Sequence, residues 1–157
     1  MEKFLENLQE AQRLIQTVDH MVYVTFPLIK DKKILVKILK ETKNAIADCI
    51  NAILQYEYLY KRIELYKNAK TNFRTFIKKC CPYYKITSEE TDSIIKLFEL
   101  AEKHEQSTIE FVREEKVVIL SENLKTETIT LEKIKEFLNL AKNILRKTLE
   151  TIKVERR

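Results

Sequence analysis

The stretch from Leu35 to Tyr66, LVKILKETKNAIADCINAILQYEYLYKRIELY, contains the pattern that decides the fold. Small and apolar residues recur along it at alternating steps of three and four, which places them on one stripe of an α-helix. The positions on this seam are Leu35, Ile38, Thr42, Ala45, Cys49, Ala52, Tyr56, Leu59, Ile63 and Tyr66. The pattern predicts a helix over residues 31–66, roughly 50 Å long at about 1.5 Å per residue. We expect so long and apolar a helix at the centre of a bundle or an oligomer.

Three other stretches have the same helical periodicity. The first predicted helix covers residues 2–22. The second starts at a capping box, in which Glu90 follows Thr87 by three residues, and is predicted to reach about Ser121. The third starts after Thr130, whose hydroxyl is suited to cap a helix N-terminus, and carries an unbroken alternation of apolar residues.

A short amphipathic helix is predicted over residues 68–81, where Pro82 ends it. The β-branched and aromatic run Val22–Phe26 is typical of a strand, but no partner strand is evident, so we interpret it as a buried linker ending at Pro27. The predicted fold is therefore all-α, with four long helices in a bundle, one short helix and coiled-coil-like packing. A single helical-bundle domain is expected over residues 1–157.

Composition excludes several classes of protein. The chain has 157 residues and no glycine, which removes P-loops and dinucleotide-binding loops and disfavours hairpin-rich sheets. Its three cysteines show no metal-binding spacing, so we expect neither a metal site nor a cofactor. Met21–Ile29, the longest nearly apolar stretch, is too short to span a membrane, and no signal peptide is apparent. We expect a cytoplasmic protein, with no small-molecule substrate evident.

A basic-aromatic segment, residues 66–85, is the most distinctive local feature. No acidic residue lies between Glu64 and Glu89, and the net charge of the whole chain is +5. The cations are Lys67, Lys70, Arg74, Lys78, Lys79 and Lys85, interleaved with Tyr66, Phe73, Phe76, Tyr83 and Tyr84. Cations that neutralise phosphates beside rings that stack on bases are typical of single-stranded nucleic-acid binding. The alternative is the ordinary solvated face of an amphipathic helix.

Two resemblances rest on short motifs. Arg13 and His20, separated by six residues, resemble the R-x(4–6)-H signature of the HEPN family, helical proteins that include RNA-cleaving toxins. The resemblance implies an RNA-cleaving pair, although Leu14 stands where the family usually has a polar residue. The runs Asp19–Pro27 and Gln55–Tyr60 resemble small uncharacterised archaeal all-helical proteins, a resemblance that implies no activity.

These patterns lead to two functional hypotheses. The first is a non-enzymatic helical-bundle protein that acts as an interaction or scaffold module, with a protein partner or a second copy of the chain bound through the seam. The second is binding of RNA or single-stranded DNA by segment 66–85, with HEPN-like cleavage as its extension. No catalytic or metal-binding residue is assigned, because the Glu-x-x-His pairs of a di-iron bundle are missing. His104 is interpreted as a hydrogen-bonded core histidine.

Overall fold

Helices make up most of the structure, and the all-α class is confirmed. The computed structural model describes the backbone of residues 2–31, 33–106, 109–113, 116–120 and 126–155, and the side chains of 2–31, 33–103 and 129–152. Its elements are α1 (Lys3–His20), η1 (Met21–Thr25), α2 (Phe26–Ile29), α3 (Lys33–Leu59), α4 (Ala69–Thr75), η2 (Phe76–Cys80), α5 (Ser88–Gln106), β1 (Ile109–Arg113), β2 (Lys116–Leu120), β3 (Thr126–Thr130) and α6 (Leu131–Glu155).

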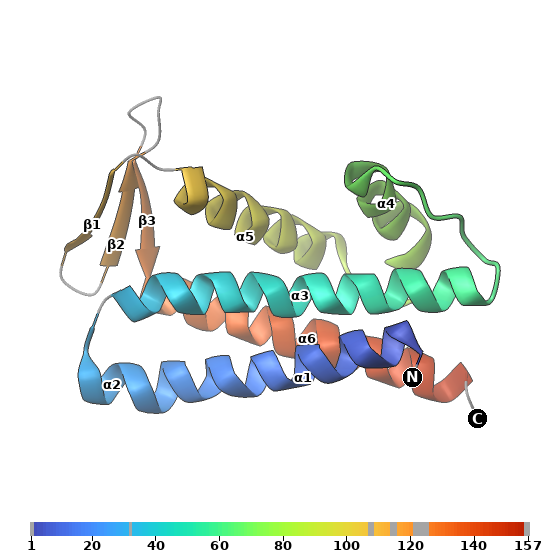
Figure 1. Cartoon of the computed structure of the whole chain (residues 1–157), viewed down its shortest axis with the longest axis horizontal. Coiled ribbons are helices and arrows are strands. Elements are labelled where there is room, and N and C mark those ends of the chain that lie inside the picture. Colours follow the sequence, from blue (N-terminus) through green and yellow to red (C-terminus); the bar gives the residue numbers. More distant parts are fainter. Residues whose placement is uncertain (1, 32, 107–108, 114–115, 121–125, 156–157) are drawn as a thin grey trace.

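The central helix α3 lies between two layers. In Figure 1, α1 and α6 run along one side of it, and α4 and α5 lie on the other. The predicted seam is buried from Leu35 to Tyr56, with every seam position in that range at most 1% exposed. The seam therefore packs against helices of the same chain and is not available as a surface for a second copy.

The predicted end of this helix was wrong. α3 ends at Leu59, and Leu59 and Tyr66, both expected on the seam, are half-exposed. The backbone N–H of Lys61 donates to Tyr58 O and that of Arg62 donates to Glu57 O, the pair of bonds that closes a helix in a Schellman turn. Such a turn needs a left-handed residue, usually glycine, and Lys61 takes that conformation with φ of 59°.

The interpretation of Val22–Phe26 as a buried linker was also wrong, since Tyr23 and Val24 of this run are 50% and 43% exposed. The chain stays helical through it as the wide turn η1, whose last bond runs from Phe26 N to Met21 O. Pro27 is the residue after Phe26, and η2 likewise ends at Cys80, two residues before Pro82. A proline has no N–H and its ring crowds the carbonyl four residues earlier, so a locally widened helix accommodates both prolines.

The second predicted helix was too long. α5 ends at Gln106, and β1, β2 and β3 then form an antiparallel sheet in which Ile109 pairs with Leu120 and Lys116 with Thr130. Val117, Val118 and Ile119 are β-branched, and such residues favour strands. β3 leads directly into α6, so the sheet joins α5 to α6 at one end of the bundle (Figure 1).

Both predicted N-terminal caps are confirmed. The backbone N–H of Glu90 donates to Thr87 Oγ1 at 3.1 Å, and that of Lys133 donates to Thr130 Oγ1 at 3.1 Å. Each bond satisfies an N–H that the first turn of a helix leaves without a partner. Among the described residues, no helix combines the length and apolar character needed to cross a membrane.

Candidate functional site

The loop after α3 is the centre of the candidate site, and an ion pair between the buried Glu57 and the partly exposed Arg62 fixes its start. Glu57 is 5% exposed, and its carboxylate accepts from Arg62 Nε at 2.5 Å and Arg62 Nη2 at 3.1 Å. The hydroxyl of Tyr84, also buried, donates to Glu57 Oε1 at 2.8 Å. A two-point contact to a planar guanidinium sets direction as well as distance, so the loop leaves α3 in a defined orientation.

Aromatic rings complete the surroundings of Arg62. Its guanidinium carbon lies 5.7 Å from the centre of the Tyr56 ring and 5.2 Å from that of Tyr60. Both distances are within the range of cation–π attraction. The charge of Arg62 is therefore balanced by Glu57, and its guanidinium packs against the rings of Tyr56 and Tyr60. These contacts assign Arg62 a role in stabilising the loop.

The far end of the loop is fixed to α4. The side-chain amide of Asn72 accepts from Tyr66 N at 2.8 Å and donates to Tyr66 O at 2.8 Å, as a paired strand would. Asn68 caps α4 by accepting from Lys70 N at 2.8 Å and Thr71 N at 3.3 Å. A loop anchored at both ends presents its side chains in fixed positions, which reduces the entropy lost on binding.

A cationic hollow of about 370 Å³ lies beside this loop. It is lined by Lys61, Arg62, Ile63, Glu64, Tyr66, Thr75 and Lys79. Lys61 and Lys79 are exposed and supply positive charge, and the Tyr66 hydroxyl donates to Glu64 Oε2 at 3.2 Å. That bond to a carboxylate raises the pKa of Tyr66, so the ring remains neutral. The hollow is chemically suited to an anion beside a flat group.

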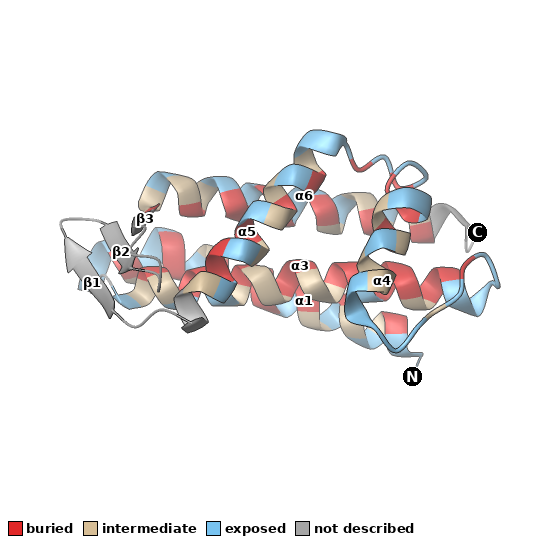
Figure 2. Ribbon diagram, turned by 90° about the horizontal axis from the view of Figure 1, so that it is seen from above, coloured by how far each residue is buried: buried red, intermediate tan, exposed pale blue. Residues whose placement is uncertain are grey.

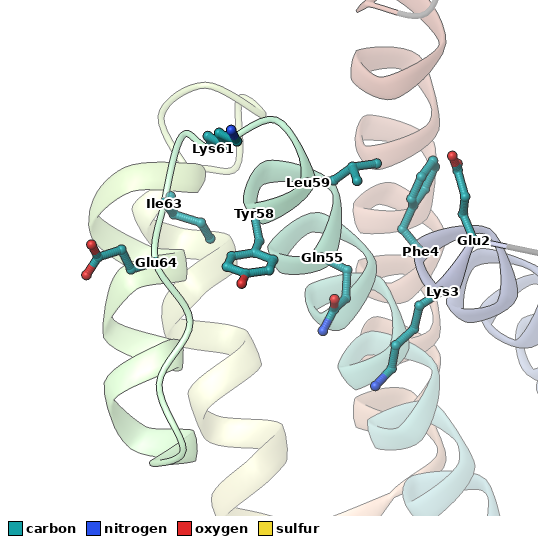
Figure 3. A pocket seen from close by; sticks show the side chains of 9 residues that line it. All are labelled: Glu2, Lys3, Phe4, Gln55, Tyr58, Leu59, Lys61, Ile63 and Glu64. Carbon is teal, nitrogen blue, oxygen red and sulfur yellow. The ribbon is translucent and has the colours of Figure 1, made fainter.

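The Tyr58 pocket, about 670 Å³, adjoins the loop as well and shares Lys61, Ile63 and Glu64 with the cationic hollow. Its lining is mostly apolar and comprises Glu2, Lys3, Phe4, Gln55, Tyr58, Leu59, Lys61, Ile63 and Glu64. In Figure 3 the Tyr58 ring lies between the side chains of Ile63 and Gln55. Tyr58 and Leu59 are about half-exposed, so solvent reaches the apolar floor.

A third depression, the α4–α5 groove, has a volume of about 800 Å³. Ile50 and Leu54 of α3 form part of its floor. Phe73 of α4 and Phe98 of α5 face across it, with ring centres 6.1 Å apart. Its lining also includes the cations Lys70 and Arg74. Figure 2 shows α4 and α5 lying over α3 at this level. The groove combines apolar surface with cations on one wall.

The predicted cations are all exposed, but the structure divides them. Lys70 and Arg74 line the α4–α5 groove, and Lys79 lines the cationic hollow. Lys67, Lys78 and Lys85 line none of these three depressions. Of the interleaved aromatics, Tyr66 and Tyr83 are half-exposed, Phe73 is partly buried, and Phe76 and Tyr84 belong to the core.

Lys61, Arg62 and Tyr58 were missed because the predicted helix ran through them. The available signal was the run Tyr58-Leu59-Tyr60, since three adjacent large side chains cannot all lie on one buried stripe. No glycine or proline marks the helix end, and the periodic seam continued in sequence beyond it.

The hydrogen bonds of the HEPN-like pair are local to α1 and the turn after it, and Arg13 also interacts electrostatically with Glu41 and Asp48 of α3. Arg13 forms an ion pair with Glu10 at 2.7 Å, and both side chains are exposed. His20 Nδ1 lies 3.3 Å from Thr25 Oγ1. The side chain of His104 lies outside the described residues.

The described residues offer no group of three histidine, cysteine, aspartate or glutamate side chains able to hold a metal ion. The cysteines are buried, and burial raises the pKa of Cys49 to about 12. For Cys80, burial and the nearby charge of Glu57 raise the pKa to about 12. Thiols held neutral in this way are poor nucleophiles.

Comparison of the chain with family models, with curated proteins and with solved structures finds no match.

Proposed function

We propose that this protein binds single-stranded nucleic acid, RNA or DNA, through exposed cations and tyrosines around the loop after α3. The observation that carries the proposal is the distribution of charge. Six of the 29 lysines and arginines, and none of the 24 acidic residues, lie within residues 65–88, so the rest of the chain has 23 cations against 24 anions. The whole positive excess therefore comes from the six cations of one segment, and all six side chains are exposed.

The rings in this region favour a single strand over a duplex. Tyr66 is 50% exposed and Tyr83 is 55% exposed, so both can offer a face to a ligand. A base stacks on such a ring only when it is not already stacked in a duplex, and stacking of this kind depends little on sequence. We therefore expect binding driven by phosphates, with weak base preference and strong salt dependence.

Fluorescence anisotropy with a labelled oligonucleotide of roughly 12 residues, within the site size of such proteins, tests the proposal. The test variant is Lys78→Glu with Lys79→Glu. The matched control is Lys37→Glu with Lys40→Glu, exposed positions near the start of α3. Both variants change the net charge from +5 to +1.

We expect the test variant to lose at least about tenfold in affinity and its salt slope to fall by about 0.7 for each phosphate contact removed. The control should bind nearly as the wild type does. Equal losses in both variants would mean that overall charge alone attracts the strand, which contradicts a site in segment 66–85. Absence of binding by the wild type at low salt would refute the function itself.

HEPN-like cleavage would be an enzymatic extension of the same proposal, with Arg13 and His20 as the reacting pair. Incubation of the bound RNA, followed by gel analysis of its length, separates binding from cleavage. Strand scission lost in Arg13→Ala and His20→Ala supports the extension, and an intact strand after prolonged incubation removes it.

A protein-interaction or scaffold module is the second candidate function, and the α4–α5 groove favours it. The seam of α3 is buried inside the chain, so self-association would use another apolar surface, and the partly buried Phe98 lies in the groove. Sedimentation velocity of the wild type and of Phe98→Glu tests this form. A dimer that the variant loses supports it, and a monomer at every concentration contradicts it.

A further inference from the structure

The Tyr58 pocket and the cationic hollow adjoin at Lys61, Ile63 and Glu64. From there the pocket extends to α1 and α3, and the hollow extends to α4 and η2. We infer that the Tyr58 pocket holds an unpaired nucleobase of the strand whose phosphates contact Lys61 and Lys79. This inference rests on the proposed function. Because Lys61, Ile63 and Glu64 line both depressions, one nucleotide can place its phosphate in the hollow and its base in the pocket.

The apolar character of the pocket suits a base. Leu59, 51% exposed, supplies most of the apolar surface, with the edges of the buried Phe4 and Ile63 beside it, and the Tyr58 ring, 52% exposed, offers a face for stacking. The volume of about 670 Å³ leaves room for a base and part of its sugar. Tyr58 is positioned from the last turn of α3, directly after Glu57, so the ion pair with Arg62 also holds the wall that Ile63 forms opposite the ring.

Charge directs the two parts of a nucleotide to different depressions. The charged residues that line the Tyr58 pocket are Glu2, Glu64, Lys3 and Lys61, which cancel, so the pocket offers no net attraction to a phosphate. In the cationic hollow, Glu57 balances Arg62, and Lys61 and Lys79 exceed the single charge of Glu64. A phosphate is therefore favoured in the hollow and a neutral base in the pocket.

Polar groups at the pocket edge match the edge of a base without selecting one. Figure 3 shows the Tyr58 hydroxyl and the Gln55 amide on the same side of the pocket. A hydroxyl and an amide each both donate and accept, so together they can satisfy the hydrogen-bonding edge of any base. We expect affinity from stacking and only weak discrimination among bases.

The experiment compares two oligonucleotides of equal charge, one with bases and one abasic, by anisotropy on the full chain. The wild type should bind the abasic strand roughly 5- to 150-fold more weakly for each stacked base lost. Tyr58→Ala should lose a similar factor on the base-containing strand and nothing on the abasic strand, whereas Tyr58→Phe should keep most of the affinity. Tyr23→Ala is the matched control, because Tyr23 is 50% exposed and belongs to η1, which leads into α2 near the other end of the bundle (Figure 1).

Each outcome decides between the two proposals. If Tyr58→Ala binds both strands as the wild type does while Lys78→Glu with Lys79→Glu still loses binding, the base pocket is wrong and the proposed function stands. If Tyr58→Ala weakens both strands equally, its effect is not on a base, and the inference is overturned. If the wild type binds neither strand, the inference falls together with the proposed function. Circular dichroism melting confirms that each variant is folded.

Discussion

Lys61 combines a cost in stability with a place at the candidate site, and replacing it with glycine separates the two. Its φ of 59° puts a residue with a β-carbon in the left-handed region, which costs roughly 1–2 kcal/mol. Glycine removes that cost, but it enlarges the conformational freedom of the unfolded chain by roughly 0.4–1 kcal/mol and removes a favourable cation from a helix C-terminus. We expect Lys61→Gly to raise the free energy of unfolding by about 0.5–1 kcal/mol.

Lys30 provides the matched comparison. It has φ of 55°, follows the C-terminus of α2, and donates its N–H to Phe26 O at 2.8 Å. Lys30→Gly should therefore stabilise the chain by a similar amount, because the backbone conformation and the helix-end charge are nearly the same. Lys30 directly follows α2, which lies at the end of the bundle away from the loop after α3 (Figure 1), so its replacement should leave oligonucleotide binding unchanged.

Urea denaturation followed by circular dichroism gives the stabilities, and anisotropy gives the affinities. For a chain of this size, a gain of that order raises the melting temperature by about 1–4 °C. Both variants should gain stability, and Lys61→Gly alone should lose affinity. A lower stability of both variants would refute the reasoning from the strained turn, and unchanged binding by Lys61→Gly would remove this lysine from the site.

Three further perturbations test other parts of the structure. Glu57→Ala should lower the free energy of unfolding, measured by urea denaturation, by about 2 kcal/mol, because Arg62 loses its buried carboxylate partner. An unchanged free energy of unfolding would mean that the ion pair does not contribute to stability. Burial and the charge of Glu10 raise the pKa of Asp48 from 3.8 to about 6, so ionised Asp48 destabilises the fold above that pH. Asp48→Asn should then stabilise the chain at pH 7 by about 1 kcal/mol after solvent screening. Denaturation curves should show this gain growing between pH 4 and pH 6 and absent below pH 4. A gain that does not depend on pH would contradict the raised pKa of Asp48 as its cause. Cys49, buried and with its pKa raised to about 12, should react with a thiol reagent only when denaturant is added, and rapid reaction in the native state would contradict its burial.

The sequence predicted those parts of the fold that depend on side-chain periodicity. The seam from Leu35 to Tyr56 is buried, and the hydroxyls of Thr87 and Thr130 cap the helices that they were expected to start. Both kinds of prediction use signals that hold for most sequences, namely burial of one stripe and the hydrogen-bonding needs of a first turn.

The wrong predictions fall where the backbone departs from regular helix without the usual residue to mark it. Lys61, with φ of 59°, follows the end of α3 at a position where glycine is the ordinary signal, and this chain has none. At Pro27 a widened turn let the helix continue through a residue expected to break it. The predicted helix runs through β1 and β2 because short groups of apolar residues fit either period.

The candidate site was predicted in part. The charges of a segment can be counted in the sequence, but the sequence does not show which side chains from different elements meet in one site. The exposure of Lys70 and Arg74 followed from their positions opposite the apolar face of a helix. The separation of these two cations in the groove from Lys79 in the hollow depends on where α4 lies relative to α3, and the loop that sets this is held by Arg62 and Asn72. These contacts join residues on different elements, so no local pattern indicates them.

The neighbouring cations Arg62 and Lys61 have different roles, which explains why an ion pair with a buried carboxylate and an exposed binding surface occur side by side. Arg62 binds Glu57 at two points and is held against Tyr56 and Tyr60, so its charge is used inside the protein. Lys61, one residue earlier, takes a left-handed conformation and lines both the pocket and the hollow. A planar guanidinium suits the first role, since it binds a carboxylate with fixed geometry, and a flexible ammonium suits the second, since it can follow a mobile phosphate. Arg62→Lys should therefore weaken oligonucleotide binding without changing the net charge, because the loop would lose the contact that orients Lys61.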